Sequence, residues 1–380
     1  MLVHFRKRIT PKLINEINRR VVEVQQEKEE NIPQEEKKKE ESESVKNKGK
    51  LMLDATCTPS DIKYPTDLGL LNEARKHTEK VIDKLYKTQK GKLKAKPRTY
   101  RKKARKDYLA IAKQKKPSRK KRTQAIKKQL QYLKRNLKHI DELVNLGAEL
   151  TVLKRRDYQL LLVVQEIYRQ QLGMFDNKKN SIEDRIVSLT QPYLRPIVRG
   201  KARQNTEFGA KISASYYDGF VFLDHLSWDN FNESKDLKAQ VEAFRNYTGH
   251  YPESVHVDQI YRSRENRAWC KERGIRISGP PLGRPKKSVS LEEKKQAQLD
   301  ARIRNEIEGK FGQGKRREGL NLIMTKLSNT SETAIAISFL VMNLNTLFSR
   351  GYYLLFCLFL GKLDLLITTR YSKWLKHKQI

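Results

Sequence analysis

The sequence of 380 residues predicts an α/β protein, with a mixed sheet flanked by helices and a large basic helical insertion after the first strand. Two apolar runs of strand length each end in a lone aspartate, Asp54 and Asp258. A long stretch after the first run combines helical periodicity with a very high positive charge. An Asp-Gly pair at 218–219, between runs rich in aromatic and β-branched residues, predicts a hairpin that returns the chain to the sheet.

The first strand is expected over 50–58, where an apolar run follows a charged one. After it, Thr66 or Asp67 is expected to cap a helix that runs to about Lys87. Apolar residues at helical spacing predict two further helices, over 123–146 and over about 153–172.

Residues 87–138 hold the densest positive charge in the chain. They contain 23 Lys or Arg residues and one acidic residue, Asp107, and so contribute +22 of the total net charge of +36. The positive charges of such a block repel one another, and phosphate groups of a bound nucleic acid would offset this repulsion. We therefore interpret the block as a clamp on the DNA backbone rather than a plain surface insertion. The side chains of this block expected to contact DNA are Lys102, Lys103, Arg105, Arg119, Lys120, Lys121 and Arg122.

From residue 195 the pattern changes to short strands that alternate with helices. The elements expected there are hairpin strands 208–215 and 220–224, a helix over about 234–248, a strand 254–257, a helix 263–272, a short strand 275–278 and a charged helix 291–308. Strand, hairpin, helix, strand and helix is the element order of an RNase H-like α/β domain.

The C-terminal part contains an apolar stretch, 334–348, followed by a shorter one, 352–360. Neither reaches the roughly 20 uninterrupted apolar residues that a membrane span needs. We therefore expect no membrane association, and interpret the first stretch as a buried helix. Asn329 is its expected N-cap, with Glu332 completing a capping box.

Composition divides the chain into six parts. Residues 29–49 contain almost no apolar side chains, which predicts a disordered charged linker. The predicted parts are a basic helical N-terminal segment 1–28, the linker 29–49, a first part of the catalytic core 50–86, the basic helical insertion 87–194, a second part of the core 195–348 and a C-terminal tail 349–380.

Acidic residues at three places are candidate catalytic residues and metal ligands: Asp54, Asp258 and a glutamate of the helical segment 304–308, which is Glu306 or Glu308. Two carboxylates on strands and one on a helix can hold a pair of divalent ions that clamp the attacking and leaving oxygens of a phosphodiester. Carboxylate oxygens are hard ligands that suit Mg²⁺, with Mn²⁺ as a substitute. The excess of 80 Lys and Arg residues over 44 Asp and Glu residues predicts a polyanionic partner for such a site.

Seven segments together resemble the DDE transposases of bacterial insertion sequences, over a region from about Met1 to Phe348. They are HFRKRI (4–9), LDATCTPSDIKYPTDLGLLNEAR (53–75), EFGAKIS (207–213), DGFVFLDHLSWD (218–229), VDQIYRSRENRAWCKERGIRISGPPLGRPKK (257–287), RNEIEGKFGQGKRREGLN (304–321) and SETAIAISFLVMNL (331–344). The resemblance implies an RNase H-like catalytic core, and it assigns Asp54 and Asp258 as the first two acidic residues of the site.

The third acidic residue of the family lies in a signature of the form Tyr-x2-Arg-x3-Glu-x6-Lys. The residues that fit it are Arg304, Glu308 and Lys315. The tyrosine position is Ala301, which departs from the signature. A competing register uses Arg302 and Glu306, but it places Gln313 where the signature has lysine. We therefore prefer Glu308 and keep Glu306 as the alternative.

The resemblance implies a transposase that hydrolyses a DNA strand at the end of its element and then joins the freed 3′-OH to target DNA. The implied partner is double-stranded DNA, both the terminal inverted repeats and the target, bound by a homodimer. The implied location is the bacterial cytoplasm, in association with the nucleoid. Arg304, Lys315, Arg316 and Arg317 are then expected to contact phosphates at the transposon end.

A second reading stays open, in which the chain is an inactive or truncated, transposase-derived DNA-binding protein without catalysis. It is suggested by the HFRKRI segment, which begins at residue 4, whereas relatives usually carry a helical domain before it. An RNA-binding protein is a third reading, suggested by the lysine-rich block. Such a binding protein has no need of three acidic residues at this spacing.

Overall fold

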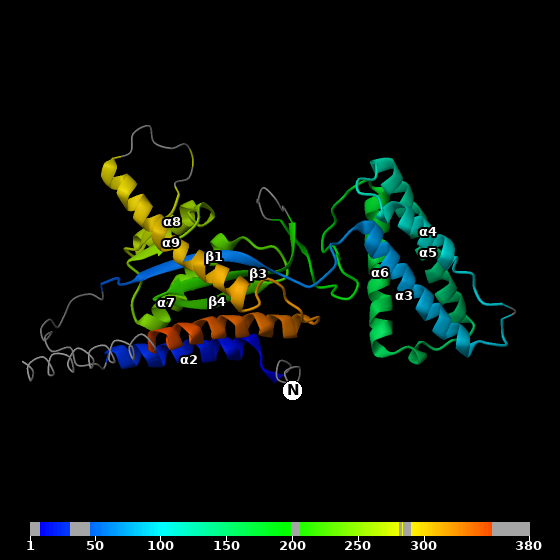
Figure 1. Ribbon diagram of the computed structural model, residues 1–380, viewed down its shortest axis with the longest axis horizontal. Helices are drawn as coiled ribbons and strands as arrows, with labels where there is room; N and C mark the ends of the chain where they lie inside the picture. The colour runs from blue at the N-terminus through cyan, green and yellow to red at the C-terminus, as the bar shows by residue number, and fades with distance from the viewer. Residues whose placement is uncertain are drawn as a thin grey trace, which may run out of the picture.

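The computed structural model of the chain describes residues 8–30, 46–93, 95–198, 206–280, 283 and 290–351. A mixed sheet with helices on both faces forms one part, and a bundle of helices forms a second part beside it (Figure 1). The predicted α/β class is therefore confirmed. Most of the predicted linker and the apolar run 352–360 lie outside the described residues.

The sheet is built around its first strand. Its strands are β1 (Lys50–Pro59), β2 (Pro196–Val198), β3 (Thr206–Tyr217), β4 (Phe220–Ser227), β5 (Ser254–His256) and β6 (Arg276–Ser278). They lie in the order β2-β3-β1-β5-β6, and β4 pairs with β3. β3 runs antiparallel to β1, while β5 is parallel to β1 and β6 is parallel to β5. β1 is thus central and buried on both faces along most of its length.

The predicted hairpin is confirmed as β3 and β4. The turn between these strands consists of Asp218 and Gly219, with φ of 45° and 82°, which is the left-handed backbone that a two-residue hairpin loop requires. Arg350 ties the turn to the last helix by donating from Nη2 to the Asp218 carbonyl oxygen at 2.6 Å. At the other end of β3, a Cβ on Gly209 would lie 2.0 Å from the Thr58 carbonyl oxygen, so β1 and β3 approach closely only because this residue is glycine.

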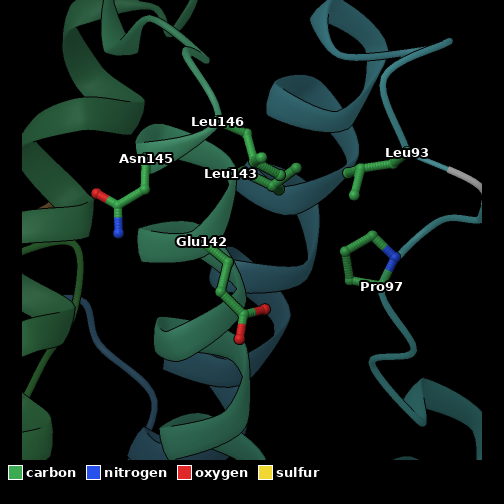
Figure 2. Close-up of a pocket in the computed structure, with 6 residues that line it drawn as sticks. All are labelled: Leu93, Pro97, Glu142, Leu143, Asn145 and Leu146. Atoms are coloured by element: carbon green, nitrogen blue, oxygen red, sulfur yellow. The ribbon is translucent and has the colours of Figure 1, made fainter.

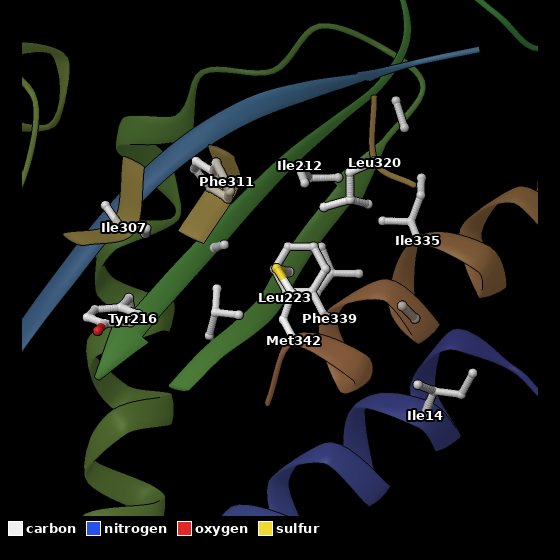
Figure 3. Packing of buried hydrophobic residues seen from close by; sticks show 14 of the residues in the cluster. Ile14, Ile212, Tyr216, Leu223, Ile307, Phe311, Leu320, Ile335, Phe339 and Met342 are labelled. Carbon is white, nitrogen blue, oxygen red and sulfur yellow. The ribbon is translucent and has the colours of Figure 1, made fainter. Parts of the chain in front are cut away.

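Helices cover both faces of the sheet. One face carries α7 (Leu237–Thr248) and α8 (Arg264–Glu272), whose apolar residues pack on β1 and β5. The opposite face carries α9 (Leu291–Arg317), the helix Ser328–Gly351 and α2 (Pro11–Glu30). Figure 3 shows this second cluster, in which Ile307 and Phe311 of α9 and Phe339 of the last helix meet side chains of the sheet.

The second part of the molecule, here called the helical lobe, lies between β1 and β2 in the sequence. It consists of α3 (Asp67–Thr88), α4 (Arg101–Ala112), α5 (Arg119–Asn145) and α6 (Arg155–Asp176). Short 3₁₀ helices are Leu150–Val152 in the lobe, with Glu233–Lys235 and Gln259–Tyr261 in the sheet part. Two apolar clusters join α3, α5 and α6. Inside the lobe, the buried Arg75 donates to Gln129 of α5 at 3.2 Å and to Asn72 at 2.7 Å, and it also pairs with Glu79.

Two sequence predictions need correction. The segment 67–86 was expected in the catalytic core, but α3 packs against α5 and α6, so the helical lobe begins with α3. The last helix begins at Ser328, which leaves Asn329 inside it rather than at its cap. Glu332 is then the fifth residue of the helix and not the third, which a capping box requires. Its Oε1 instead accepts a hydrogen bond from Trp228 Nε1 at 2.7 Å.

The helix Ser328–Gly351 is longer than the sequence predicted. Within the described part of the chain it is one helix whose length and composition would allow it to cross a membrane, and 44% of its most apolar window is buried inside the protein. Its side chains Ile335, Phe339 and Met342 are fully buried against the sheet. This packing agrees with the expected buried helix.

Candidate active site

Asp54 lies in the middle of β1, and its neighbours in the strand, Leu53 and Ala55, are both buried. The Ala55 N–H donates to Asp54 Oδ1 at 2.8 Å, which holds the carboxylate close to the strand. Burial raises the pKa of Asp54 to about 6, and the negative charges of Asp258 and Glu308 act in the same direction, against the Ala55 hydrogen bond and the charge of Arg304. Asp54 thus lies within electrostatic reach of both other predicted acidic residues.

Asp258 follows β5, and the strand register explains why it lies near Asp54. β1 and β5 are parallel neighbours, and Met52 pairs with His256. Asp54 and Asp258 are each two residues beyond that pair, so the register places them side by side. The turn behind Asp258 is also fixed, since Gly279 has φ of 142° and a Cβ there would lie 2.4 Å from the Val257 carbonyl oxygen.

One face of α9 brings the third acidic residue to the strands. Residues four apart on a helix share a face, and Asp300, Arg304 and Glu308 follow that spacing. Arg276 of β6 donates from Nη1 and Nη2 to the two oxygens of Asp300, at 2.8 and 3.0 Å. At the other end of α9, Lys315 Nζ donates to Thr56 Oγ1 of β1 at 2.9 Å. The helix is therefore anchored on both sides of Glu308.

Arg304 lies between the acidic residues. Its Nη1 is 3.3 Å from Asp258 Oδ1, and its Nη2 is 2.9 Å from Glu308 Oε1. The guanidinium side chain is 23% exposed, compared with 53% for Asp258 and 48% for Glu308. One planar cation thus joins a carboxylate after β5 to a carboxylate on α9, near the buried carboxyl group of Asp54.

The alternative residue, Glu306, lies elsewhere on α9. It hydrogen-bonds Tyr216 of β3, whose pKa is raised to about 12 by burial and by the charge and hydrogen bond of Glu306. Glu308, in contrast, is held by Arg304 and influences Asp54. The two glutamates therefore have different surroundings, Glu306 beside Tyr216 and Glu308 beside Arg304.

The predicted DNA contacts fall into two groups. Lys315 is half-buried and bonded to Thr56, and Arg316 and Arg317 are exposed in the last turn of α9. The seven predicted basic residues of the 87–138 block are all exposed on the helical lobe. In the described part of the chain, none of these seven forms an ion pair with an acidic residue. Asp107, in contrast, is engaged, since it accepts from Tyr132 at 2.8 Å and from Lys128 at 3.4 Å.

The donor chemistry of the three carboxylates fits a divalent cation. They are hard oxygen ligands of like charge, and the raised pKa of Asp54 reflects burial near two further negative charges, which a bound cation would relieve. As the side chains lie, no group of three His, Cys, Asp or Glu residues within the described ranges could hold a metal ion. The guanidinium of Arg304 supplies the positive charge between Asp258 and Glu308 instead.

Sequence reasoning missed the anchoring residues of α9, although the spacing of Asp300 relative to Arg304 and Glu308 was a usable signal. His256, which shares a strand with Asp258, is fully buried and bonded to Ser254 Oγ at 3.0 Å and Ser278 Oγ at 3.2 Å. Burial lowers the pKa of His256 to about 4. This histidine therefore holds β5 to its surroundings and does not face a substrate.

A hollow in the helical lobe lies apart from the acidic residues. It is formed between the end of α5 and the segment after α3, and it is mostly apolar (Figure 2). Its lining residues are Leu93, Pro97, Glu142, Leu143, Asn145 and Leu146. None of the predicted site residues lines it.

Comparison with known families gives a match over part of the chain. Residues 255–345 match the family described as the transposase DDE domain. The matched range contains Asp258, Arg304, Glu308 and Lys315, whereas Asp54 lies before it. The search of curated proteins gives no match. Over residues 255–345, the chain is therefore similar to the DDE domain of transposases.

Proposed function

We propose that this protein cuts DNA at the ends of a mobile element by metal-dependent hydrolysis and joins the freed 3′-OH to target DNA. The observation that carries the proposal is the bridge that Arg304 forms between Asp258 and Glu308, with Asp54 close enough for both of their charges to raise its pKa. The match to the transposase DDE domain supports a DNA substrate.

The order of the strands supports an RNase H-like core. β1 lies at the centre, with the antiparallel strands β3 and β4 on one side and the parallel strands β5 and β6 on the other. In this arrangement Asp54 sits on a strand that is paired on both sides, so its backbone cannot shift without disturbing the sheet. A rigid backbone is what a site needs when its side chains must hold reacting oxygens to within a fraction of an ångström.

Asp54, Asp258 and Glu308 would hold Mg²⁺, with Mn²⁺ as a substitute. When bound, the ions supply the positive charge that stabilises the leaving oxygen and promotes ionisation of the attacking water or 3′-OH. The protein's own contribution is to present three carboxylates in their charged form. Because the pKa of Asp54 is raised to about 6, its carboxylate is mostly charged only above that pH unless a cation lies beside it.

The helical lobe would hold DNA by its backbone. Its seven exposed basic side chains, defined above, carry charge without acidic partners among the described residues. Cations that meet phosphates release counterions and bind without reading sequence. We therefore propose that the lobe adds affinity, while the acidic site performs the chemistry.

Strand cleavage by purified variants tests the proposal. The substrate is a DNA duplex that carries the sequences flanking the gene, with Mg²⁺ or Mn²⁺ present. Asp54→Asn, Asp258→Asn and Glu308→Gln should each lower the cleavage rate by at least about 100-fold while DNA binding persists. Glu306→Gln is the matched control on the same helix and should cleave at the wild-type rate.

The same assay separates the second reading from the first. A non-catalytic DNA-binding protein derived from a transposase would bind the duplex but would not cut it with either Mg²⁺ or Mn²⁺. Loss of cleavage in Glu306→Gln with full cleavage in Glu308→Gln would show that the third acidic residue is wrongly assigned.

A further inference from the structure

We propose that Arg304 acts as an internal counter-cation, which pairs with Asp258 and Glu308 in the DNA-free protein. When DNA binds, the guanidinium group of Arg304 moves to a DNA phosphate and frees both carboxylates. DNA and the divalent ion therefore bind cooperatively. This inference rests on the proposed function, because it concerns the regulation of the same acidic site. Arg304 is here a positioning residue that controls when the carboxylates are available.

The geometry places the guanidinium where a metal ion would have to compete with it. Arg304 contacts Asp258 Oδ1 at 3.3 Å and Glu308 Oε1 at 2.9 Å, and its charge also reaches Asp54. Both contacted oxygens belong to the donor set proposed for the metal. A divalent ion that arrives while Arg304 remains in place would meet a positive charge and two occupied oxygens.

The helix that carries Glu308 is anchored on both sides of this residue. Asp300, one turn before Arg304, is held by two hydrogen bonds from Arg276. Lys315, two turns beyond Glu308, is held by Thr56. Ile307 and Phe311 are buried between these points. Release therefore requires rotation of the Arg304 side chain, which its partial exposure of 23% permits.

A DNA phosphate is the anion best suited to draw Arg304 away. The guanidinium group forms paired hydrogen bonds to phosphate oxygens, and such charge-assisted bonds are stronger than neutral ones. Asp258 and Glu308 are about half exposed, so a DNA strand can approach them and Arg304 together. Once Arg304 has moved to the phosphate, both carboxylates regain their full negative charge for the ion. Linkage then requires that the ion raises DNA affinity by the same factor.

Binding of Mn²⁺ to the whole chain, followed by electron paramagnetic resonance with and without duplex DNA, tests the inference without any cleavage. The variants are Arg304→Gln, which removes the counter-cation, and Arg302→Gln, which removes an equal charge from an exposed position two residues away. Arg304→Lys is a second variant that keeps the charge but cannot bridge two carboxylates. Mn²⁺ bound by DNA alone is subtracted.

In the wild-type protein and in Arg302→Gln, DNA should tighten Mn²⁺ binding by about 5- to 150-fold. Without DNA, Arg304→Gln should bind Mn²⁺ more tightly than wild type does. Addition of DNA should increase the Mn²⁺ affinity of this variant only slightly. Arg304→Lys should fall between the two. If Arg304→Gln binds Mn²⁺ as weakly as wild type without DNA, the counter-cation role is overturned while the proposed function stands. If no variant binds Mn²⁺ in any condition, the proposed metal site fails, and the inference fails with it.

Discussion

Lys315 of α9 donates a hydrogen bond from Nζ to Thr56 Oγ1 of β1 at 2.9 Å, and Thr56 lies two residues after Asp54. The bond joins the helix that carries Glu308 to the strand that carries Asp54. The relative position of these two acidic residues, far apart in sequence, thus depends in part on a contact that neither of them makes.

Thr56→Val tests this anchor without removing the positive charge of Lys315. Thr56 is buried, so loss of its hydroxyl should lower the free energy of unfolding by about 0.5–1.5 kcal/mol. DNA affinity should stay unchanged, because the lysine can still meet a phosphate, whereas Lys315→Gln should weaken it. Urea unfolding and filter binding measure the two effects. Equal loss of DNA affinity in both variants would contradict an anchoring role for Thr56.

Asp54→Asn should make the metal-free protein more stable at neutral pH. The pKa of Asp54 is about 6 in the folded protein, against 3.8 for an ordinary aspartate. The folded state therefore binds more protons than the unfolded state between these values, and the free energy of unfolding falls as the pH rises through them. Above about pH 6 the charged Asp54 lowers the free energy of unfolding by its full amount, on the order of 2 to 3 kcal/mol. The uncharged asparagine of Asp54→Asn does not cause this loss.

Urea unfolding at about pH 8 and about pH 4 measures this difference, which should shrink at the lower pH. Excess Mg²⁺ should stabilise wild type more than Asp54→Asn, because the variant lacks one of the three proposed ligands. A metal-free Asp54→Asn protein that is less stable than wild type at the higher pH would contradict the assigned environment of Asp54.

Neutralising the helical lobe should reduce the salt dependence of DNA binding. Each phosphate contact contributes about −0.9 to the slope of log affinity against log salt, so changing the seven exposed basic residues to glutamine should reduce the slope by up to about 6. Sequence preference should not change, since backbone contacts carry none. Arg155→Gln with Arg156→Gln, exposed at the start of α6, is the control within the same lobe. An unchanged slope in the seven-residue variant would rule out the clamp.

Much of the sheet and its acidic residues could be predicted from sequence because local patterns determine them. The apolar runs before Asp54 and Asp258 mark strands, and the parallel register of Met52 with His256 confirms that these strands are neighbours. The Asp-Gly pair likewise marked the hairpin, because few residues other than glycine adopt its backbone angles easily.

Other features depend on contacts between distant segments, which a local pattern does not reveal. The apolar stripe of α3 predicts burial, but not that α5 and α6 rather than the sheet cover it. Glu332 was expected to complete a capping box, yet its carboxylate accepts a hydrogen bond from Trp228, a residue of the sheet part. The bridge from Arg304 to Asp258 also spans two separate segments, and only the folded chain brings them together.

Cleavage of the polypeptide by bound iron tests the central claim most directly. Fe²⁺ replaces Mg²⁺ at oxygen-rich sites and, with ascorbate and peroxide, cuts the backbone close to where it is bound. In the DNA-bound protein we predict cuts near Asp54, Asp258 and Glu308, all suppressed by excess Mg²⁺ and lost in Glu308→Gln. Cuts confined to other segments, or cuts that excess Mg²⁺ leaves unchanged, would contradict a single divalent-ion site formed by these three carboxylates.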